Sequence, residues 1–167
     1  ENGMDLAMKY GLPANQIIKT GNWLGPLLVA AAENGVKKLL LFGYHGKLIK
    51  LSGGVFHTHH HLADGRIEIL TSLAFREGIS FDLIKLISKS TSVENALLTL
   101  EVSNPEAVSL IWSRMAKEIE IKSRSYVNRY LSSSMEIGSV LFDRKRQMRW
   151  AGLEGLKQIN SFGLILK

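Results

Sequence analysis

Cysteine is absent from the 167-residue sequence. Disulfide bonds, thiolate metal sites and cysteine nucleophiles are therefore excluded, and the lack of any export signal favours a cytoplasmic location. Long hydrophobic runs are absent as well. No stretch approaches the roughly 20 apolar residues of a membrane-spanning helix, and the first residues lack a basic segment followed by an apolar block. We therefore expect a protein that has no membrane partner.

Acidic residues are the minority among the charged ones, with 15 Asp and Glu against 21 Lys and Arg, which gives a net charge of +6. Positive charge favours anionic partners such as nucleic acid, phosphorylated cofactors or polycarboxylate substrates. The densest basic run, residues 143–149, has only Trp150 beside it, whereas a nucleic-acid site interleaves several aromatic residues for base stacking. We interpret this run as a solvated turn after a strand and do not expect nucleic acid as a partner.

Proline is rare, with 3 residues, and we find no internal repeat or low-complexity linker. Hydrophobic residues make up 46% of the chain and charged residues 22%, which is typical of one globular domain with a substantial core. We expect one α/β domain over residues 1–150 and a C-terminal tail over residues 151–167. The tail has no clear period in its first half, and its apolar end fits either a strand or a frayed terminus.

The hydrophobic pattern predicts a layered α/β fold. Residues 16–20 and 36–42 are β-prone runs, and the alanine-rich stretch 23–34 between them is typical of a buried helix. Strand, helix and strand in this order predict a βαβ unit with parallel strands. The hydrophobic periods and capping residues further along the chain predict helices over residues 64–77, 80–88, 93–100 and 105–131, and a strand over residues 135–142. We therefore expect a mixed central sheet covered by several helices.

Glycine-rich junctions follow both early strands, at residues 21–25 and 43–47. Open α/β sheets bind ligands at the carboxyl ends of their strands, and glycine is typical of positions where a ligand approaches the backbone closely. Neither junction matches the GxGxxG dinucleotide pattern or the GxxxxGK[ST] phosphate loop. The sequence predicts a ligand site other than an ordinary nucleotide site, and leaves open that each junction is a plain tight turn.

Four histidines follow this region: His57, His59, His60 and His61. Imidazole is a common metal ligand, so His57, His59 and His61 are candidate ligands of a metal-dependent enzyme. The same side chains also suit helix capping and hydrogen bonding in the core, or binding of an anionic ligand. The sequence leaves these alternatives open.

Three segments together resemble one family. They are GNWLG at residues 21–25, the block GYHGKLIKLSGGVFHTHHHLADGR at residues 43–66, and GSVLFDR at residues 138–144. They are similar to the CbiD family, the cobalt-precorrin-5B C(1)-methyltransferases of anaerobic cobalamin biosynthesis. The resemblance extends over roughly residues 3–149, and the family's members are longer. We therefore expect this chain to be their C-terminal portion, with the missing N-terminal part as its partner.

The resemblance implies transfer of a methyl group from S-adenosyl-L-methionine to carbon 1 of cobalt-precorrin-5B, giving cobalt-precorrin-6A. Such a transfer depends on holding donor and acceptor in line, so no protein-bound metal is expected. The candidate residues fall into three groups. Those for the methyl donor are Gly21, Asn22, Gly25, Gly43 and Gly46; those for the carboxylates of the cobalt corrinoid are Lys47, Lys50 and Arg66; those for proton handling are His59 and Asp64.

Two other classes of function remain open. One is the metal-dependent enzyme built on the histidines, and the other is a noncatalytic ligand-binding fragment. The sequence also leaves open whether the domain forms a homodimer.

Overall fold

The computed structural model of the protein describes residues 3–59 and 61–166. These residues form α-helices and three strands, with one short 3-10 helix near the start. In chain order the elements are α1 (Gly3–Lys9), η1 (Ala14–Gln16), α2 (Leu24–Glu33), β1 (Lys38–Tyr44), α3 (His45–Ser52), α4 (Arg66–Arg76), α5 (Phe81–Ser88), α6 (Val93–Ser103), α7 (Pro105–Val127), β2 (Glu136–Phe142), β3 (Met148–Ala151) and α8 (Leu153–Ser161).

The strands form one mixed sheet in the order β1-β2-β3. β1 and β2 are parallel, with Lys38 opposite Glu136 at one end and Tyr44 opposite Phe142 at the other. β3 then pairs antiparallel with β2 through a tight turn. The α/β class and the mixed sheet expected from the sequence are confirmed.

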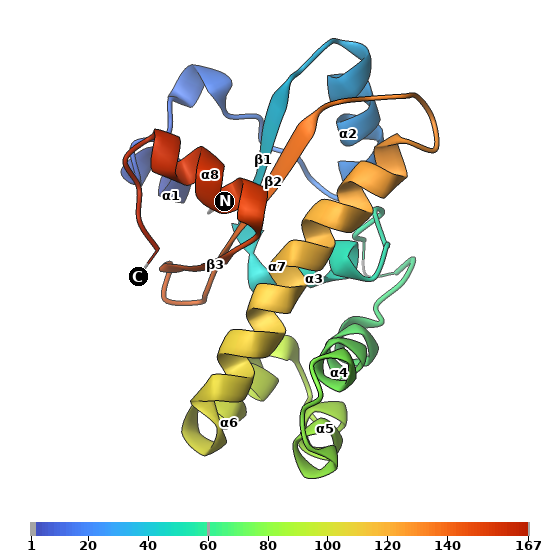
Figure 1. Cartoon of the computed structure of the whole chain (residues 1–167), viewed down its shortest axis with the longest axis vertical. Helices are drawn as coiled ribbons and strands as arrows, with labels where there is room; N and C mark the ends of the chain where they lie inside the picture. The colour runs from blue at the N-terminus through green and yellow to red at the C-terminus, as the bar shows by residue number, and fades with distance from the viewer. Residues whose placement is uncertain (1–2, 60, 167) are drawn as a thin grey trace.

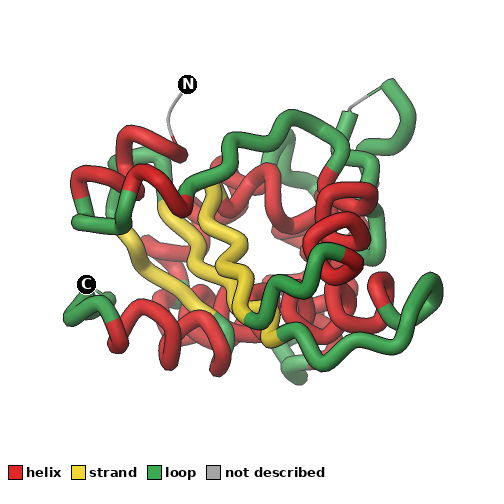
Figure 2. The backbone as a smooth tube through the Cα atoms, turned by 90° about the horizontal axis from the view of Figure 1, so that it is seen from above, coloured by secondary structure: helices red, strands yellow, loops and turns green. Residues whose placement is uncertain are grey.

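Helices cover both faces of the sheet (Figures 1 and 2). Two buried apolar clusters lie on opposite sides of it. One contains Leu41, Ile137 and Leu141 of the sheet together with α7, and the other contains Val140 and Ile159, with α8 packed over them. Because successive strand residues point to opposite faces, an apolar strand between two helical layers needs no polar alternation. This explains the unbroken hydrophobic runs in β1 and β2.

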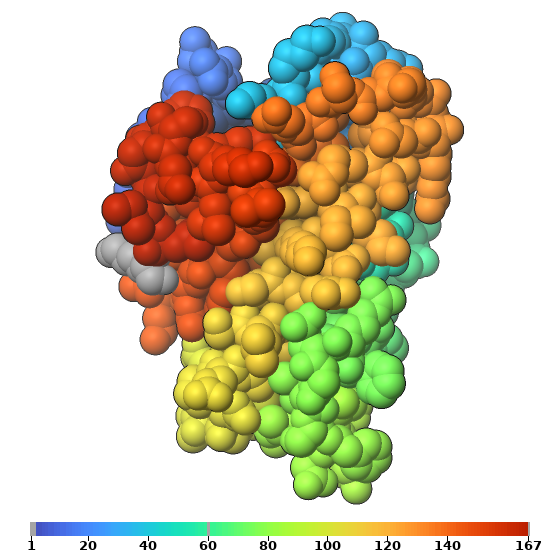
Figure 3. Space-filling model, viewed as in Figure 1, coloured from blue at the N-terminus to red at the C-terminus, as the bar shows by residue number. Residues whose placement is uncertain are grey.

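The long helix α7 packs against both the sheet and several of the other helices. It begins with Asn104, whose side-chain oxygen accepts the N–H of Ala107 at 2.9 Å, and with Pro105 in its first turn. Trp112 and Met115 on its inner face are fully buried. α4 and α6 pack against it, and α5 packs against those two helices. All three lie below the sheet in Figure 1 and form the green and yellow lower part of the molecule in Figure 3. The helices predicted in this region are confirmed, although α7 ends at Val127 and not at residue 131.

The first predicted strand is wrong. Gln16 ends η1, and residues 17–20 are an irregular segment after it, although Ile17 has an extended backbone. A strand exists only where a neighbour accepts its hydrogen bonds, and no neighbour is present beside this segment among the described residues. The parallel pair is formed instead by β1 and β2, which are far apart in the sequence.

Three further boundaries differ from the expectation. The glycine-rich junction at residues 43–47 contains no loop, because β1 ends at Tyr44 and α3 begins at His45. Residues 148–151 form β3, so only residues 144–147 of the basic run are the exposed turn. The segment after residue 151 contains α8, which packs against β2. None of the helices within the described ranges is long and apolar enough to cross a membrane.

Candidate functional site

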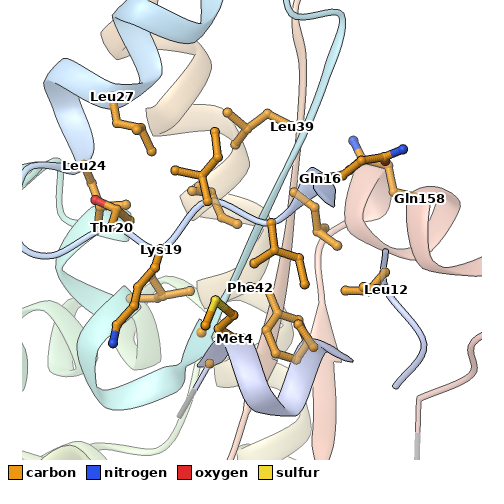
Figure 4. A pocket seen from close by; sticks show the side chains of 18 of the residues that line it. Met4, Leu12, Gln16, Lys19, Thr20, Leu24, Leu27, Leu39, Phe42 and Gln158 are labelled. Carbon is orange, nitrogen blue, oxygen red and sulfur yellow. The ribbon is translucent and has the colours of Figure 1, made fainter. Parts of the chain in front are cut away.

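A cleft of about 1280 Å³ runs along β1 towards the carboxyl ends of the two parallel strands. β1 forms one wall, and residues 12–21 form the other, with α2 and α8 at the two ends (Figure 4). Leu39 and Phe42 point into it from β1, and Met4 and Leu12 add to its apolar lining. In the space-filling view a notch separates the blue N-terminal segment from the region of α2 and β1 (Figure 3).

Cations gather in the lining of this cleft. They are Lys19, Lys38, Lys47, Arg144 and Arg146, against Asp143 as the acidic residue of the described lining. Lys38 belongs to the amino end of β1, where it pairs with Glu136 at 3.3 Å. The two arginines follow the carboxyl end of β2, and Lys47 lies in the first turn of α3 after the carboxyl end of β1. Positive charge at this end of a sheet suits an anionic ligand.

Lys47 connects the two glycine junctions predicted from the sequence. Its Nζ donates a hydrogen bond of 3.0 Å to the carbonyl oxygen of Gly21. Burial lowers the pKa of Lys47 below its ordinary value, because removing the ammonium group from water disfavours its charged form. An anion in the cleft would therefore find a partly desolvated cation held in place by a backbone carbonyl.

A network of four side chains, two of them fully buried, lies beside this end of the cleft. Glu94 accepts two hydrogen bonds at one carboxylate oxygen, from the hydroxyl of Tyr44 at 2.7 Å and from Nε2 of His45 at 3.0 Å. On its other side His45 receives the indole N–H of Trp112 at Nδ1, at 3.1 Å. Tyr44 also lines the cleft, so the network connects the cleft to the core around α7.

The proton positions in this network follow from the donors. An indole N–H only donates, so Nδ1 of His45 must be its acceptor and the ring proton must be on Nε2. This tautomer donates to Glu94, which satisfies both ring nitrogens of a fully buried imidazole. Burial lowers the pKa of His45, despite the opposing effect of Glu94, so the neutral ring predominates at neutral pH. Burial and the hydrogen bond to Glu94 together raise the pKa of Tyr44, which keeps the phenol protonated.

A second charged group lies at the carboxyl end of β2. Arg149 of β3 forms ion pairs with Glu101 and, at 3.6 Å, with the buried Asp143. Its guanidinium also lies 4.4 Å from the ring centre of Trp150, in cation–π contact. Asp143 in turn accepts the backbone N–H of Gln147 at 3.0 Å, which fixes the turn that carries the two cleft arginines.

Of the residues predicted for the site, the structure brings Gly21, Gly43 and Lys47 into the cleft. A side chain at Gly43 would meet Leu48, its Cβ only 2.8 Å from a methyl carbon, so glycine is needed where β1 turns directly into α3. Gly46 lies in the same turn, and its Cβ would be 2.6 Å from the ring of Tyr44. Gly46 therefore shapes the cleft by allowing this ring to pack against α3.

Asn22 and Gly25 take part in packing instead of lining the cleft. The side-chain oxygen of Asn22 accepts the hydroxyl of Thr58 at 3.1 Å, which ties the start of α2 to the segment after α3. A Cβ on Gly25 would lie 2.5 Å from the hydroxyl oxygen of Tyr126, so this glycine lets α2 approach α7.

Lys50 and the pair of Asp64 and Arg66 lie away from the cleft lining. Lys50 is 3% exposed, and its Nζ donates to the carbonyl oxygens of Thr58 at 3.2 Å and Ala63 at 2.5 Å. Asp64 pairs with Arg66 through two hydrogen bonds of 2.5 and 2.8 Å. This ion pair lowers the pKa of Asp64. Gly65 between the two residues precedes the first residue of α4 and has a φ of 58°.

The histidines lie on the segment that Lys50 holds. His57 packs edge-on against Trp23 with ring centres 4.1 Å apart, and the rings of His59 and His61 lie 5.0 Å apart. Across residues 3–59 and 61–166, no group of three or more His, Cys, Asp or Glu side chains is placed to hold a metal ion. His60 lies outside the described residues.

Sequence reasoning missed most of the network around His45. Tyr44 and His45 stood out between two glycines, but Glu94 and Trp112 come from α6 and α7. Their spacing along the chain carries no signal, because only the packing of α6 and α7 beneath the sheet brings them together.

Comparison with known protein families matches residues 57–152 to the family described as "CbiD, C-terminal domain". This match covers more than half of the 167 residues. The chain belongs to the CbiD family. The resemblance of the three sequence segments is thereby confirmed.

This CbiD chain is also similar over its whole length to curated relatives named "Cobalt-precorrin-5B C(1)-methyltransferase". It is 98% identical over 167 residues to the protein of Prochlorococcus marinus strain NATL2A, and this match covers 100% of the chain and 44% of the relative. Identity to the protein of Prochlorococcus marinus strain MIT 9313 is 54% over 164 residues, 98% of this chain and 43% of the relative. Identity to the protein of Synechococcus sp. strain CC9902 is 53% over 152 residues, 91% of this chain and 41% of the relative. The chain therefore spans less than half the length of these relatives. Comparison with solved structures finds no significant match.

Proposed function

We propose that this chain is the C-terminal part of an enzyme that methylates carbon 1 of cobalt-precorrin-5B to give cobalt-precorrin-6A in cobalamin biosynthesis. The observation that carries the proposal is the 98% identity of the whole chain to two relatives that bear the name of this activity. The methyl donor is S-adenosyl-L-methionine, and the full-length enzyme works in the cytoplasm with the remaining part of the polypeptide as partner.

The chemistry places modest demands on the protein. The nucleophilic carbon of the corrinoid attacks the methyl group, the sulfur–methyl bond breaks as the carbon–carbon bond forms, and S-adenosylhomocysteine leaves. Alignment of the two reactants supplies much of the rate in such a step. The cations at the carboxyl end of the cleft suit this task.

In this proposal the carboxyl ends of β1 and β2 hold the charged groups of the reactants. Lys47 and Arg144 pair with carboxylates, for which a charged donor makes the stronger hydrogen bond. The first turn of α3 has no side-chain cap, so its backbone N–H groups also favour a carboxylate. Gly21, where an added Cβ would meet nothing within 4 Å, allows the ligand to approach the backbone. The ring of Tyr44, fixed by Glu94, forms a wall of the site.

The other predicted residues serve this site indirectly. Asn22, Gly25, Gly46 and Lys50 fix the elements around the cleft through the contacts described above. His59, Asp64 and Arg66 lie between α3 and the first turn of α4. In this proposal the remaining part of the enzyme contacts that segment, and these three residues bind substrate or transfer protons there.

Calorimetric titration of S-adenosylhomocysteine, together with mass-spectrometric assay of corrinoid methylation, tests the proposal on the full-length enzyme. Saturable binding and formation of the methylated product are expected. Titration into the 167-residue chain alone then locates the donor site. Binding would place that site within this chain, and no binding would place it at the interface with the missing part.

Lys47→Ala in the full-length enzyme should weaken the affinity for the corrinoid by at least about tenfold, because a hydrogen bond to a charged group contributes about 1.5–3 kcal/mol. Lys89→Ala, which removes an exposed lysine after α5, is the matched control and should change nothing. Equal affinity of both variants would reject the role of Lys47, and a full-length enzyme that forms no methylated corrinoid would reject the function.

A further inference from the structure

β1 has the sequence of a strand that lies inside a sheet. Its residues alternate between the two apolar clusters, with Leu39 and Leu41 facing the cluster around α7, and Leu40 and Phe42 facing the cluster around α8. Strands that are buried on both faces read as continuous hydrophobic runs, and they are typical of the interior of parallel sheets. A sheet edge is not where such a strand is expected.

The position of β1 contradicts its composition. In the part of the chain that the structure describes, it pairs with β2 alone, which leaves its other edge open. Of its seven residues Leu41 alone is buried, whereas six of the seven residues of β2 are buried. The two strands are similarly apolar, so the difference in burial comes from their places in the sheet: β2 has a strand on each side, and β1 has one on one side only among the described residues.

The opposite edge of the same sheet is built differently. β3 has four residues, carries Arg149, and meets β2 with a register shift between Leu141 and Phe142. Shortness, charge and bulges are the features by which edge strands avoid pairing with other chains. β1 is longer, pairs with β2 without a register shift, and has a single charge, Lys38, at its first position. β3 is a protected edge, and β1 is not.

The space beside β1 fits an extended segment. The cleft follows the whole strand from Lys38 to Tyr44, and its volume of about 1280 Å³ exceeds the roughly 300–1,000 Å³ of small-molecule pockets. Residues 12–21 bound it on the far side, where Ile18 lines it and is 73% exposed. An apolar strand beside β1 would cover both walls.

We propose that a β-strand from the part of the full-length polypeptide outside this chain pairs with the open edge of β1. The chain spans 44% of the length of its relatives, so more than half of the polypeptide is available to supply this strand. The strand runs between β1 and residues 17–20 and extends the sheet. The cations at the carboxyl end of β1 then lie at the junction of the two parts. This inference rests on the proposal that the chain is part of a longer enzyme.

Hydrogen exchange in the full-length protein, resolved by residue, is the first test. Successive N–H groups of a strand point to opposite edges, so β2 protects only every second amide of residues 39–43. If a strand docks, both sets of amides exchange slowly, within about tenfold of each other. Exchange of the outward set at the rate of unstructured peptide would overturn the proposal.

Photo-crosslinking identifies the occupant. A benzophenone amino acid replaces Ile18 in the full-length protein, and in a matched variant it replaces Val102, an aliphatic residue of α6 that is 89% exposed and distant from the cleft. We expect crosslinks from position 18 to residues outside this chain, and none from position 102. The experiment uses a mixture of isotope-labelled and unlabelled protein, so that crosslinks between copies are recognised.

Each other outcome overturns the proposal. Crosslinks from position 18 that stay within residues 1–167 of the same copy would assign the edge to the chain's own N-terminal segment, and crosslinks between copies would assign it to a homodimer. Neither experiment measures methyl transfer. A protein that docks the strand but forms no methylated corrinoid would therefore reject the proposed activity alone.

Discussion

At the scale of single residues, the molecule uses its buried polar groups mainly to fix the elements around the cleft. His45 is fully buried and has a partner on each ring nitrogen, Trp112 on one side and Glu94 on the other. Lys50 is nearly as buried, and it holds two backbone carbonyls of the histidine segment. Both residues lie in the block at residues 43–66 that resembles the CbiD family. Their hydrogen bonds connect elements of the fold to one another.

His45 should make stability depend on pH. Burial lowers its pKa in the folded state, so below the ordinary value of about 6.5 the unfolded chain binds a proton that the folded chain does not. The free energy of unfolding should therefore fall as pH decreases from about 6.5 towards the folded-state pKa, by at most about 1.4 kcal/mol per pH unit. Urea unfolding of the wild type and of His45→Gln between pH 8 and pH 5, an interval of about three units around this value, measures the slope.

His45→Gln should flatten that slope, and His61→Gln, which removes an exposed histidine, should leave it in place. An unchanged slope in His45→Gln would show that other groups carry the pH dependence.

Lys50→Met should destabilise the fold by about 1–3 kcal/mol, since two carbonyl oxygens lose their donor in a partly buried setting. Lys89→Met removes an exposed lysine and serves as the control. Thermal melting of the three proteins decides between the structural task and the substrate role predicted from the sequence. A melting temperature equal to that of the control, together with lost substrate affinity, would favour the substrate role.

At the scale of elements, close backbone approaches determine how α8 joins the sheet. Glu120 of α7 accepts the N–H groups of Ser139 at 3.0 Å and Gly155 at 2.8 Å, so one carboxylate connects α7, β2 and the first turn of α8. Gly155 lies against the backbone of β2, and a Cβ there would collide with the carbonyl oxygen of Ser139. The contact depends on a glycine and on a carboxylate from α7, and neither residue adds to a hydrophobic pattern in the sequence.

Gly155→Ala should therefore lower the free energy of unfolding by about 1–3 kcal/mol, the usual cost of forcing extra volume into a packed site. The effect is opposite to the gain that Ala normally brings to a helix. Gly3→Ala in α1 is the matched control, because its nearest neighbour, the carbonyl oxygen of Phe42, would be 3.8 Å away. Urea unfolding of both variants measures the difference, and equal stabilities would contradict the close packing of α8.

At the scale of the whole molecule, the sheet has one protected edge and one open edge. The open edge of β1 is flanked by apolar side chains, which in a separately produced chain creates a template for pairing with another copy. The 167-residue chain should therefore self-associate as its concentration rises. Ile18→Lys, which places a charge on the cleft wall, should reduce this association, and Val102→Lys, at a site that is also exposed, should not. Sedimentation velocity over a concentration series gives the result, and a chain that stays monomeric at all concentrations would contradict the expectation.

The sequence by itself determined the class of fold, most helices and two strands, because these depend on local patterns. The hydrophobic period of α7, with Asn104 and Pro105 at its start, specifies a helix wherever it packs. The three family segments likewise identified the chain, since they are read from letters and not from contacts.

Only the tertiary structure decided which strands pair and which side chains meet. Residues 16–20 have the composition of a strand but no partner among the described residues, whereas β1 found its neighbour in β2, nearly a hundred positions away. Glu94 and Trp112 reach His45 from helices whose sequences carry no sign of it. Hydrogen bonds between distant segments depend on how the helical layers pack on the sheet, and that packing is a property of the whole chain, not of any local stretch.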